Sequence, residues 1–483
     1  MRGRRMRAAA LCAAALALVA CTSTGGSTPP PTAPAAIPDS APASTPGGSA
    51  VPALWAGYHG DAARTGYVPG AVADPARELW SVDLGSAVYG QPVVTGDTVI
   101  VGTESDEVVA LDRRTGRRLW SHGLGAPVTD IVGRTGCGNI DPLGITSSLA
   151  VDSARGEVFA VGEVLGAAGA VHHRLVGLDA KTARQLLSED VDPPLPAGEK
   201  AVNLLQRAGL AIGNGRVYIG YGGNIGDCGR YHGWLVGASE TSPGDLVSFE
   251  VARDGEGGAI WLSGGAPAIG PDGHVYVTTG NANPFPAARD EFEHTESVLK
   301  LSPDLKVLAA FKDPDAGGDE DLATGNPVLL PGDLVFAVGK TDAGYLLRTS
   351  DLSRVAVIRD VCGSDPDGGP AYDPATQRLF VPCRGGGIQI VDVARHRLGR
   401  RLEGANSAPI VVGTTVWATS YPAGGLTAFS AASGAQTQRV GTDAVPTFAT
   451  PSSAGGMLFL GTRTGGAPRG GGAAPRGGGG GEA

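Results

Sequence analysis

The sequence predicts an all-β protein built as a β-propeller. A unit of four short strands recurs along the chain, and its alternating apolar residues are bounded by Gly and Asp turns. The 77 glycines suit many tight turns between such strands. Beyond the first 20 residues, no stretch shows convincing helical periodicity. We therefore expect a ring of four-stranded blades.

The clearest repeat unit extends from Gln91 to Trp120. Its first part, Gln91 to Thr103, has two apolar segments around a Gly-Asp turn, which predicts a hairpin of strands A and B. Its second part begins at Val108 and predicts a strand C that ends in Leu-Asp, a turn, and a strand D that ends in Trp120.

The strand C pattern recurs at six further places, each with an apolar strand B upstream: Leu175–Asp179, Leu235–Ala238, Val298–Ser302, Tyr345–Arg348, Ile388–Asp392 and Leu426–Ser430. An eighth A–B pair around Met457–Gly461 could take its strand D from Glu78–Leu84. Closing the ring with strands from both termini would remove an open sheet edge. The pattern therefore favours eight blades, the last closed by strands from both termini, with seven blades as the alternative.

The N-terminus has the features of an export signal. Four Arg precede an apolar run from Ala8 to Ala20, which is shorter than the roughly 20 residues of a spanning helix. Leu18-Val19-Ala20-Cys21 resembles a bacterial lipobox, and this resemblance implies that Cys21 becomes the lipid-modified first residue of the mature chain. An ordinary secretory signal with an incidental Cys is the alternative.

Composition divides the chain into four parts. Residues 1–20 form the expected lipoprotein signal peptide, and residues 21–52 form a disordered tether rich in Pro, Ser, Thr and Gly. The propeller is expected over residues 53–464, followed by a Gly-rich disordered tail over residues 465–483. We therefore expect an exported domain, anchored to the outer side of the cell membrane through lipid on Cys21.

The charge balance excludes nucleic acid as a partner. The full chain has a net charge of −10, and removal of the four Arg in residues 1–20 moves it to about −14. We expect a monomer that binds an unknown ligand or an envelope protein.

The cysteines predict disulfides. Cys137, Cys228, Cys362 and Cys383 remain after Cys12 leaves with the signal and Cys21 takes lipid, and an even number in an exported protein favours disulfides. Four cysteines allow three pairings. Their places in the repeats favour Cys362–Cys383 within blade 6 and Cys137–Cys228 across blades 2 and 3.

Two motifs make the family recognisable. The Leu-Asp-x-x-Thr-Gly-x-x-Leu-Trp unit from Leu111 to Trp120 resembles the tryptophan-docking repeat of quinoprotein propellers, and Trp55 to Gly66 resembles the lead-in segment of the same family. The segment from Gly257 through Gly332 is similar to uncharacterised exported propellers of this group. The resemblance is to pyrroloquinoline-quinone-like (quinoprotein alcohol dehydrogenase-like) propellers, and it implies the fold more strongly than the activity.

The resemblance extends to parts of the enzyme equipment. Thr279 to Pro284 looks like the turn whose Asn ligates calcium in these enzymes, which would make Asn281 a metal ligand. The loop with Asp319 and Asp321 looks like the one that supplies the catalytic carboxylate. The adjacent cysteine pair of the enzymes and a Cys-x-x-Cys-His haem motif are absent from this sequence. A turn at Asn281 and a solvated acidic loop are the alternatives.

Loop lengths indicate which face carries function. The A–B hairpins are short, whereas several B–C connections are long: Glu163 to Val171, Gly222 to His232 and Asn281 to Glu296. In a four-stranded meander the B–C and D–A loops share one face. We expect a binding face there, with candidate residues His232, Asn281, His294, Asp319 and Asp321.

The sequence therefore favours a cell-envelope lipoprotein whose propeller is a non-catalytic ligand- or protein-binding module without a cofactor. One alternative is an enzyme like the quinone-dependent dehydrogenases, with pyrroloquinoline quinone and calcium, Asn281 as metal ligand and Asp319 or Asp321 as base. Another is a scaffold for envelope protein assembly.

Overall fold

The computed structural model describes residues 54–282, 293–463 and 466–467. The expected signal peptide, the tether, Cys21 and most of the Gly-rich tail lie outside the described residues. Within them, no helix is both long and apolar enough to cross a membrane.

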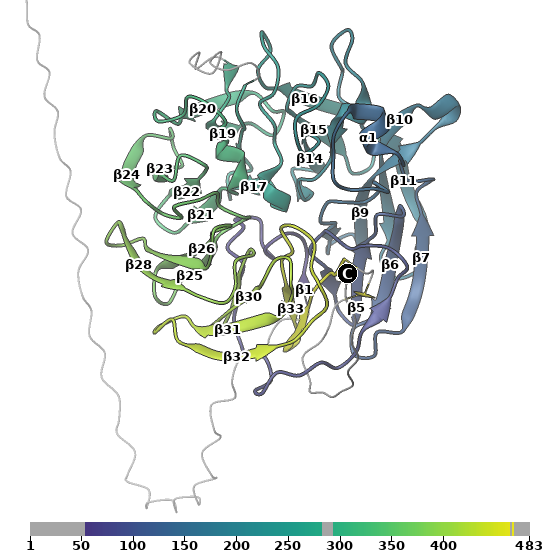
Figure 1. Ribbon diagram of the computed structural model, residues 1–483. Helices are drawn as coiled ribbons and strands as arrows, with labels where there is room; N and C mark the ends of the chain where they lie inside the picture. Colours follow the sequence, from purple (N-terminus) through teal and green to yellow (C-terminus); the bar gives the residue numbers. More distant parts are fainter. Residues whose placement is uncertain (1–53, 283–292, 464–465, 468–483) are drawn as a thin grey trace, which may run out of the picture. The chain divides into compact units, whose positions relative to one another are not determined.

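Seven antiparallel blades surround a central axis (Figure 1). The first four blades consist of the following strands: β4 (Val93–Thr95), β5 (Thr98–Gly102), β6 (Glu107–Asp112) and β7 (Arg118–Gly123) in blade 1; β8 (Ala150–Asp152), β9 (Glu157–Leu165), β10 (Val171–Asp179) and β11 (Gln185–Asp190) in blade 2; β12 (Leu204–Leu205) and β13 (Ala211–Gly213), which both pair with β14 (Arg216–Gly223), then β15 (Trp234–Ser239) and β16 (Leu246–Glu250) in blade 3; β17 (Ala268–Ile269), β18 (Val275–Thr278), β19 (Ser297–Leu301) and β20 (Val307–Lys312) in blade 4.

The last three blades follow the same order: β21 (Val328–Leu330), β22 (Leu334–Val338), β23 (Gly344–Arg348) and β24 (Arg354–Ile358) in blade 5; β25 (Ala371–Asp373), β26 (Arg378–Pro382), β27 (Ile388–Asp392) and β28 (Arg397–Leu402) in blade 6; β29 (Ile410–Val412), β30 (Thr415–Thr419), β31 (Leu426–Ser430) and β32 (Gln436–Val440) in blade 7. Every expected strand C forms, as β10, β15, β19, β23, β27 and β31. The all-β propeller prediction is therefore confirmed.

The eight-blade prediction is not confirmed. The strands expected to form an eighth blade make two separate two-stranded sheets, β33 (Ser452–Ala454) with β34 (Met457–Phe459) and β3 (Val82–Asp83) with β35 (Gly466–Ala467). No backbone ladder joins the two pairs among the described residues. Trp80, Leu458 and Phe459 nevertheless pack in one apolar cluster with side chains of blades 1 and 7, so these segments seal the junction between the first and last blades.

The core lies between the blades. Apolar clusters are shared by neighbouring blades, as where Phe159 of blade 2 packs in one cluster with Val217 of blade 3. Alternating strand residues point to opposite faces of a blade, and both faces are covered because each blade lies against the next. This explains why β15 and β27 are buried along their whole length.

One local expectation needs correction. The B–C connection of blade 2 is shorter than expected, because β9 extends to Leu165 and β10 begins at Val171. Among the described residues, the short α-helix α1 (Ile131–Thr135) follows blade 1, and 3-10 turns lie at η1 (Ala167–Gly169), η2 (Ala201–Asn203), η3 (Leu262–Gly264) and η6 (Leu322–Thr324). At five residues or fewer, they are too short to show helical periodicity in the sequence.

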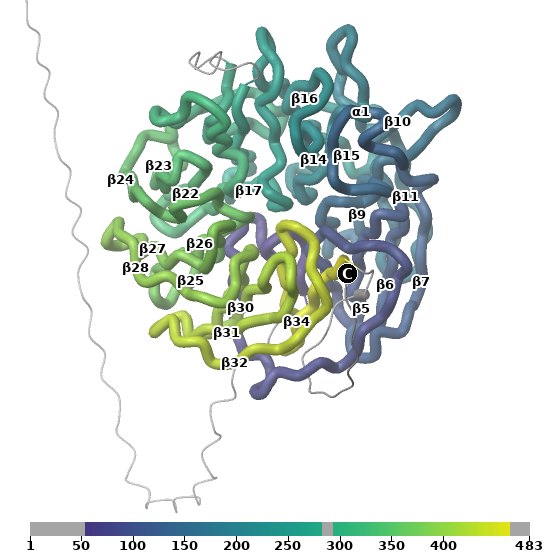
Figure 2. Tube along the Cα trace, in the orientation of Figure 1, coloured from purple at the N-terminus to yellow at the C-terminus, as the bar shows by residue number. Residues whose placement is uncertain are grey.

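The lead-in segment crosses the middle of the ring, where Figures 1 and 2 show it in purple. It begins as β1 (Leu54–Trp55), which pairs with β4 of blade 1, and ends as β2 (Tyr67–Val68), which pairs with β29 of blade 7. Between them, carbonyl groups of the segment accept backbone hydrogen bonds of 2.7 to 3.0 Å from the innermost strands of blades 2, 4, 5, 6 and 7. One short segment therefore ties most of the ring together from the inside.

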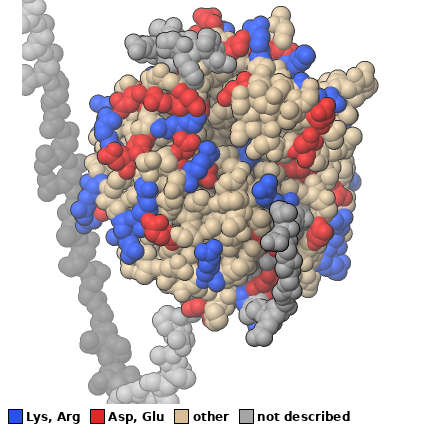
Figure 3. Space-filling model, in the orientation of Figure 1, with Lys and Arg blue, Asp and Glu red and all other residues tan. Residues whose placement is uncertain are grey.

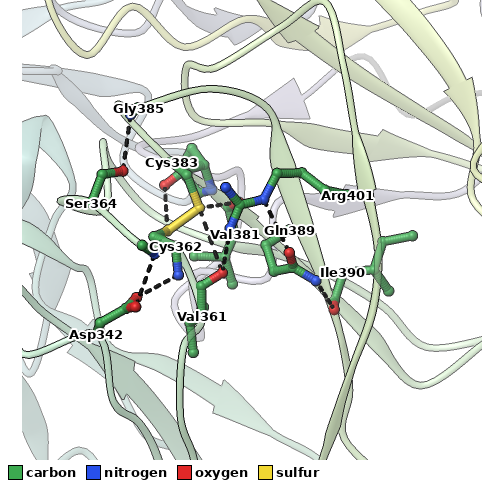
Figure 4. The surroundings of a disulfide bond; sticks show 12 residues. Asp342, Val361, Cys362, Ser364, Val381, Cys383, Gly385, Gln389, Ile390 and Arg401 are labelled. Carbon is green, nitrogen blue, oxygen red and sulfur yellow. Dashed lines mark hydrogen bonds between the residues drawn. A yellow bond between two sulfur atoms is a disulfide. The ribbon is translucent and has the colours of Figure 1, made fainter.

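Both expected disulfides are present. Cys362–Cys383 lies inside blade 6, where the carboxylate of Asp342 accepts hydrogen bonds from the backbone N–H groups of Cys362 and Gly363 (Figure 4). Cys137–Cys228 joins the segment between blades 1 and 2 to the B–C loop of blade 3.

Candidate ligand-binding site

A cavity of about 470 Å³ opens on the face formed by the B–C and D–A loops. Its volume lies in the range of small-molecule sites. The lining residues come from the segments between neighbouring blades and from B–C loops: Asn139, Leu205, Arg207, Gly223, Asn224, Ile225, Gly226, Asp227, Trp261, Ser263, Asp319, Asp321, Thr324, Lys340, Arg384, Tyr421, Thr447 and Phe448. The structure therefore places its cavity on the face that loop lengths indicated.

One side of the cavity is acidic and contains an ion-pair network. The ammonium of Lys340 lies 2.7 Å from Oδ2 of the buried Asp321, and it also contacts the exposed carboxylate of Asp319. The backbone N–H of Asn281 donates to Oδ1 of Asp321 at 2.9 Å. The structure thus brings together three of the sequence candidates, Asn281, Asp319 and Asp321, and adds Lys340.

Burial and charge set the protonation of this network. Burial raises the pKa of Asp321 to about 6, although Lys340 acts in the opposite direction. Burial alone would lower the pKa of Lys340, but the Asp321 and Asp319 carboxylates outweigh it and raise that pKa. Lys340 therefore stays charged and is held by both carboxylates at neutral pH.

The other side of the cavity is aromatic and cationic. The guanidinium of Arg207 lies 4.5 Å from the ring centre of Phe448 and 5.3 Å from that of Tyr89. Its Nη2 donates to the carbonyl of Thr447 at 2.7 Å, and its buried Nε has no hydrogen-bond partner. Burial lowers the pKa of Arg207 from its usual value. This side can receive a negatively charged group.

Arg384 also lines the cationic side, but it is already paired. Its guanidinium lies 3.2 Å from Asp365 and 3.3 Å from the buried Asp367. Arg207 has no such carboxylate within 4 Å among the described residues. An anionic ligand would therefore give Arg207 the charged partner that Arg384 already has.

Two sequence candidates lie away from the cavity. His232 is buried, and its Nδ1 lies 2.5 Å from Oε1 of Glu199. The backbone carbonyl of His294 accepts a hydrogen bond from the Thr279 hydroxyl, and its ring lies 5.7 Å from that of Phe249. Both histidines belong to loop packing and are not part of the cavity wall.

Sequence reasoning missed Arg207, Lys340, Trp261 and Phe448. They come from four different junctions or loops of the ring, so no local motif contains them. A signal was present for Arg207, which is the one charged residue between Leu204 and Leu210 and has Gln206 beside it. An Arg in an otherwise mostly apolar, buried segment indicates a functional or structural partner.

The disulfide Cys137–Cys228 supports one wall of the cavity. Its two cysteines flank the lining residues Asn139, Gly226 and Asp227. The cross-link therefore fixes this wall before any ligand binds.

Comparison with known proteins identifies the type of propeller. Residues 64–228 match the sequence model of a family described as outer membrane protein assembly factor BamB. The quinohemoprotein alcohol dehydrogenase ADH IIB of Pseudomonas putida is 25% identical over 253 residues, which are 48% of this chain and 34% of that protein. The 1-butanol dehydrogenase (cytochrome c) of Thauera butanivorans is 29% identical over 180 residues, which are 35% of this chain and 24% of that protein. The chain thus spans about a third or less of the length of these curated relatives.

Solved structures show the same fold at low sequence identity. The quinohemoprotein alcohol dehydrogenase of Comamonas testosteroni has a TM-score of 0.65 at 15% identity, covering 84% of this chain and 76% of that one. BamB of Moraxella catarrhalis has a TM-score of 0.56 at 12% identity, covering 82% of this chain and 99% of that one. Together with the seven blades and the repeat motifs, these matches make the chain a β-propeller of the pyrroloquinoline-quinone-like type.

Proposed function

We propose that the propeller is a non-catalytic binding module, and that its cavity takes a small anionic ligand with a flat part. We further propose that the chain is exported and held at a membrane by lipid on Cys21. The observation that carries the ligand class is Arg207, a buried guanidinium between two aromatic rings with an unpartnered Nε. A buried charge is costly unless it is paired, and an anionic ligand would supply the partner. The aromatic ring of Phe448 would lie beside a flat ligand.

The acidic side of the cavity supports a binding role over catalysis. A general base must be free to accept a proton from substrate. Asp321 and Asp319 both contact the ammonium of Lys340, and Asp321 also accepts the N–H of Asn281. These interactions hold the carboxylates in place and reduce their availability as bases.

The residues do not fit a calcium ion of the kind that the resemblance implies. Calcium takes six to eight oxygen ligands. The carboxylates of Asp319 and Asp321, which would have to supply such ligands, are both held by the ammonium of Lys340. A cation therefore already occupies the place beside Asn281 and Asp321 where calcium would bind.

A quinone-dependent dehydrogenase is the second candidate function, and Asp321 favours it. A buried carboxylate with a pKa of about 6 is suited to proton transfer near neutral pH. The two curated relatives are named as alcohol dehydrogenases. This candidate would need a metal or quinone to reorganise the Lys340 network.

Calorimetry of the purified propeller with pyrroloquinoline quinone, a flat tricarboxylate, as the probe tests both candidates. We expect binding that does not depend on added calcium and that weakens at least tenfold in Arg207→Met, since Met retains apolar contact with Phe448 and removes the charge. Arg114→Met, at an exposed turn of blade 1, is the matched control and should bind as the wild type does.

Calcium-dependent binding with dye reduction in the presence of an alcohol would instead support the dehydrogenase. Absence of binding by the wild type would contradict a cavity for flat anions. In that case copurification of envelope proteins would test the scaffold role that the matched family's description suggests.

A further inference from the structure

At two junctions of this propeller, a tryptophan of one strand D segment bonds to the C–D turn of the next blade. In blade 1, Trp120 lies in strand D (β7), and its Nε1 donates at 3.2 Å to the carbonyl of Ala180, in the C–D turn of blade 2. At the closing junction, Trp80 donates at 3.1 Å to the carbonyl of Arg113, in the C–D turn of blade 1. A large flat side chain thus fills the gap between one blade and the next turn.

Arg400 stands at this position in blade 6. It follows Asp392, the last residue of strand C, by the same eight residues that separate Trp120 from Asp112. Its Nη1 donates at 3.4 Å to the carbonyl of Ser433, in the C–D turn of blade 7. The docking geometry is kept, but an arginine replaces the indole.

A strand irregularity aims Arg400 into the junction. Leu398 pairs with Val391 and Arg401 pairs with Gln389, so Gly399 and Arg400 both lie opposite Ile390. Arg401 contacts the other side of the blade, where its Nη2 donates to the carbonyl of Val361 and its Nε donates to Gln389 (Figure 4).

A groove of about 140 Å³ lies beside Arg400, between blades 6 and 7. This is about ten times the volume that a cavity needs to hold one water molecule. Three arginines from separate positions line the groove: Arg378 at the start of β26, Arg397 at the start of β28, and Arg400. These positions lie at the A–B and C–D ends of the strands, opposite the cavity described above.

The groove has an excess of positive charge. Asp392 is the one acidic residue that lines it, and this carboxylate is held by Arg395 at 2.8 Å. Arg378, Arg397 and Arg400 make no ion pair within 4 Å among the described residues. Four of the seven residues from 395 to 401 are arginine, in a chain with a net charge of −10. Figure 3 shows Arg and Lys side chains gathered at the edge of the molecule over β28.

Arg378 anchors the groove to the next blade. Its Nη1 donates to the carbonyls of Ala431 at 3.1 Å and Ala432 at 2.6 Å. Ala431 corresponds in position to Ala180, the acceptor of the docking tryptophan in blade 2. Arg378 and Arg400 therefore both bond to the C–D turn of blade 7, and Arg397 lines the groove beside them.

We propose that this groove binds a phosphate- or sulfate-bearing ligand. The planar forks of two arginines match the oxygens of such an anion, and a third guanidinium adds charge from the side. The source is either a small soluble phosphate compound or the headgroup of an anionic lipid, since both present the same chemistry.

Calorimetric titration of the whole propeller with inorganic phosphate and with sulfate, at constant ionic strength against chloride, tests the site. We expect phosphate to bind to the wild type and affinity to fall at least tenfold in the double variant Arg397→Gln with Arg400→Gln. Arg117→Gln is the matched control, because Arg117 follows Asp112 in blade 1 as Arg397 follows Asp392, beside a junction that Trp120 fills. Its affinity should not change.

A second variant separates binding from folding. Arg400→Trp introduces the residue that blade 1 has at this position, where Trp120 bonds to the next blade, so the variant should fold and lose phosphate binding. Equal heats for phosphate and chloride would overturn the proposal, and so would an equal loss of phosphate affinity in Arg117→Gln and in the double variant.

Binding to lipid vesicles distinguishes the two sources of the ligand. If the protein is retained on vesicles of phosphatidylglycerol but not of phosphatidylcholine, and the double variant is not retained, the ligand is the lipid headgroup. Phosphate binding without vesicle retention would identify a soluble ligand.

Discussion

At the scale of single residues, the most unusual feature is a set of buried carboxylates where blades 1 and 2 meet. Asp106 is fully buried, and neither of its carboxylate oxygens has a hydrogen-bond partner. Burial raises its pKa to about 8, and the charges of Glu163 and Glu104 act in the same direction. Burial also raises the pKa of Glu104 to about 7. Sequence patterns could not reveal these groups, since the burial of each depends on the neighbouring blade.

Asp106 makes stability depend on pH. Because its pKa in the folded protein lies above that in the unfolded chain, the folded state binds more protons between those values. The contribution of Asp106 to the free energy of unfolding is fully present at acidic pH and is lost as the pH rises through about 8. In Asp106→Asn, the free energy of unfolding should therefore fall less between pH 5 and pH 8 than it does in the wild type. Asn tolerates the positive φ of 59° at this position, so the backbone should be unchanged. Urea unfolding at both pH values measures this, and parallel declines in the two proteins would contradict it.

At the scale of elements, the strands were predictable and their docking was not. The order of strands A to D follows from alternating apolar residues between Gly and Asp turns, which are local signals. Trp80 was predicted within a strand D, but its role depends on a partner in another blade. Its ring packs against Gly116, where an added Cβ would lie 2.7 Å from the indole, and against Phe459 at 6.1 Å between ring centres.

Removing Trp80 should loosen the closing junction. We expect Trp80→Ala to lower the free energy of unfolding by about 3–5 kcal/mol, the usual cost of deleting a large buried side chain. Trp80→Phe should cost less, since it keeps much of the apolar contact and loses the hydrogen bond to Arg113, worth about 1 kcal/mol. The neighbouring exposed Leu79 gives the control Leu79→Ala, expected to change stability by about 0.5 kcal/mol or less. Denaturant unfolding gives all three values, and equal losses for Trp80→Ala and Leu79→Ala would show that the junction is not sealed by this residue.

At the scale of the whole molecule, the ring is held from its centre as well as at its closing junction. The lead-in segment from Leu54 to Val68 bonds to the inner strands of most blades. Arg64 fixes its path: Nε donates to the carbonyl of Pro267 at 2.9 Å, and Nη1 donates to the carbonyls of Tyr58 and Asp61 at 3.0 Å. Its side chain therefore joins the segment to blade 4.

Arg64→Met should destabilise the whole ring. The change removes the side-chain donor from the carbonyls of Pro267 and Tyr58, and buried acceptors without partners cost about 1–3 kcal/mol each. We expect a loss of at least about 2 kcal/mol in the free energy of unfolding, together with faster proteolysis in several blades at once. Arg155→Met, on a more exposed side chain of blade 2, is the control. Proteolysis confined to residues near Arg64 would mean that the segment does not tie the blades together.

Local patterns alone establish the all-β class, the positions of the strands and the propeller type, because turn residues and a period of two are encoded over a few neighbouring residues. They also place Cys137, Cys228, Cys362 and Cys383 well enough to suggest both disulfides. The number of blades, the path of the lead-in segment and the members of the cavity are set by the folded ring. Closure of the ring depends on the space left between blades 7 and 1. Arg207, Lys340 and Phe448 line one cavity only because three separate junctions or loops open on the same face. These are contacts between distant segments, and each is decided by packing that no single stretch of sequence contains.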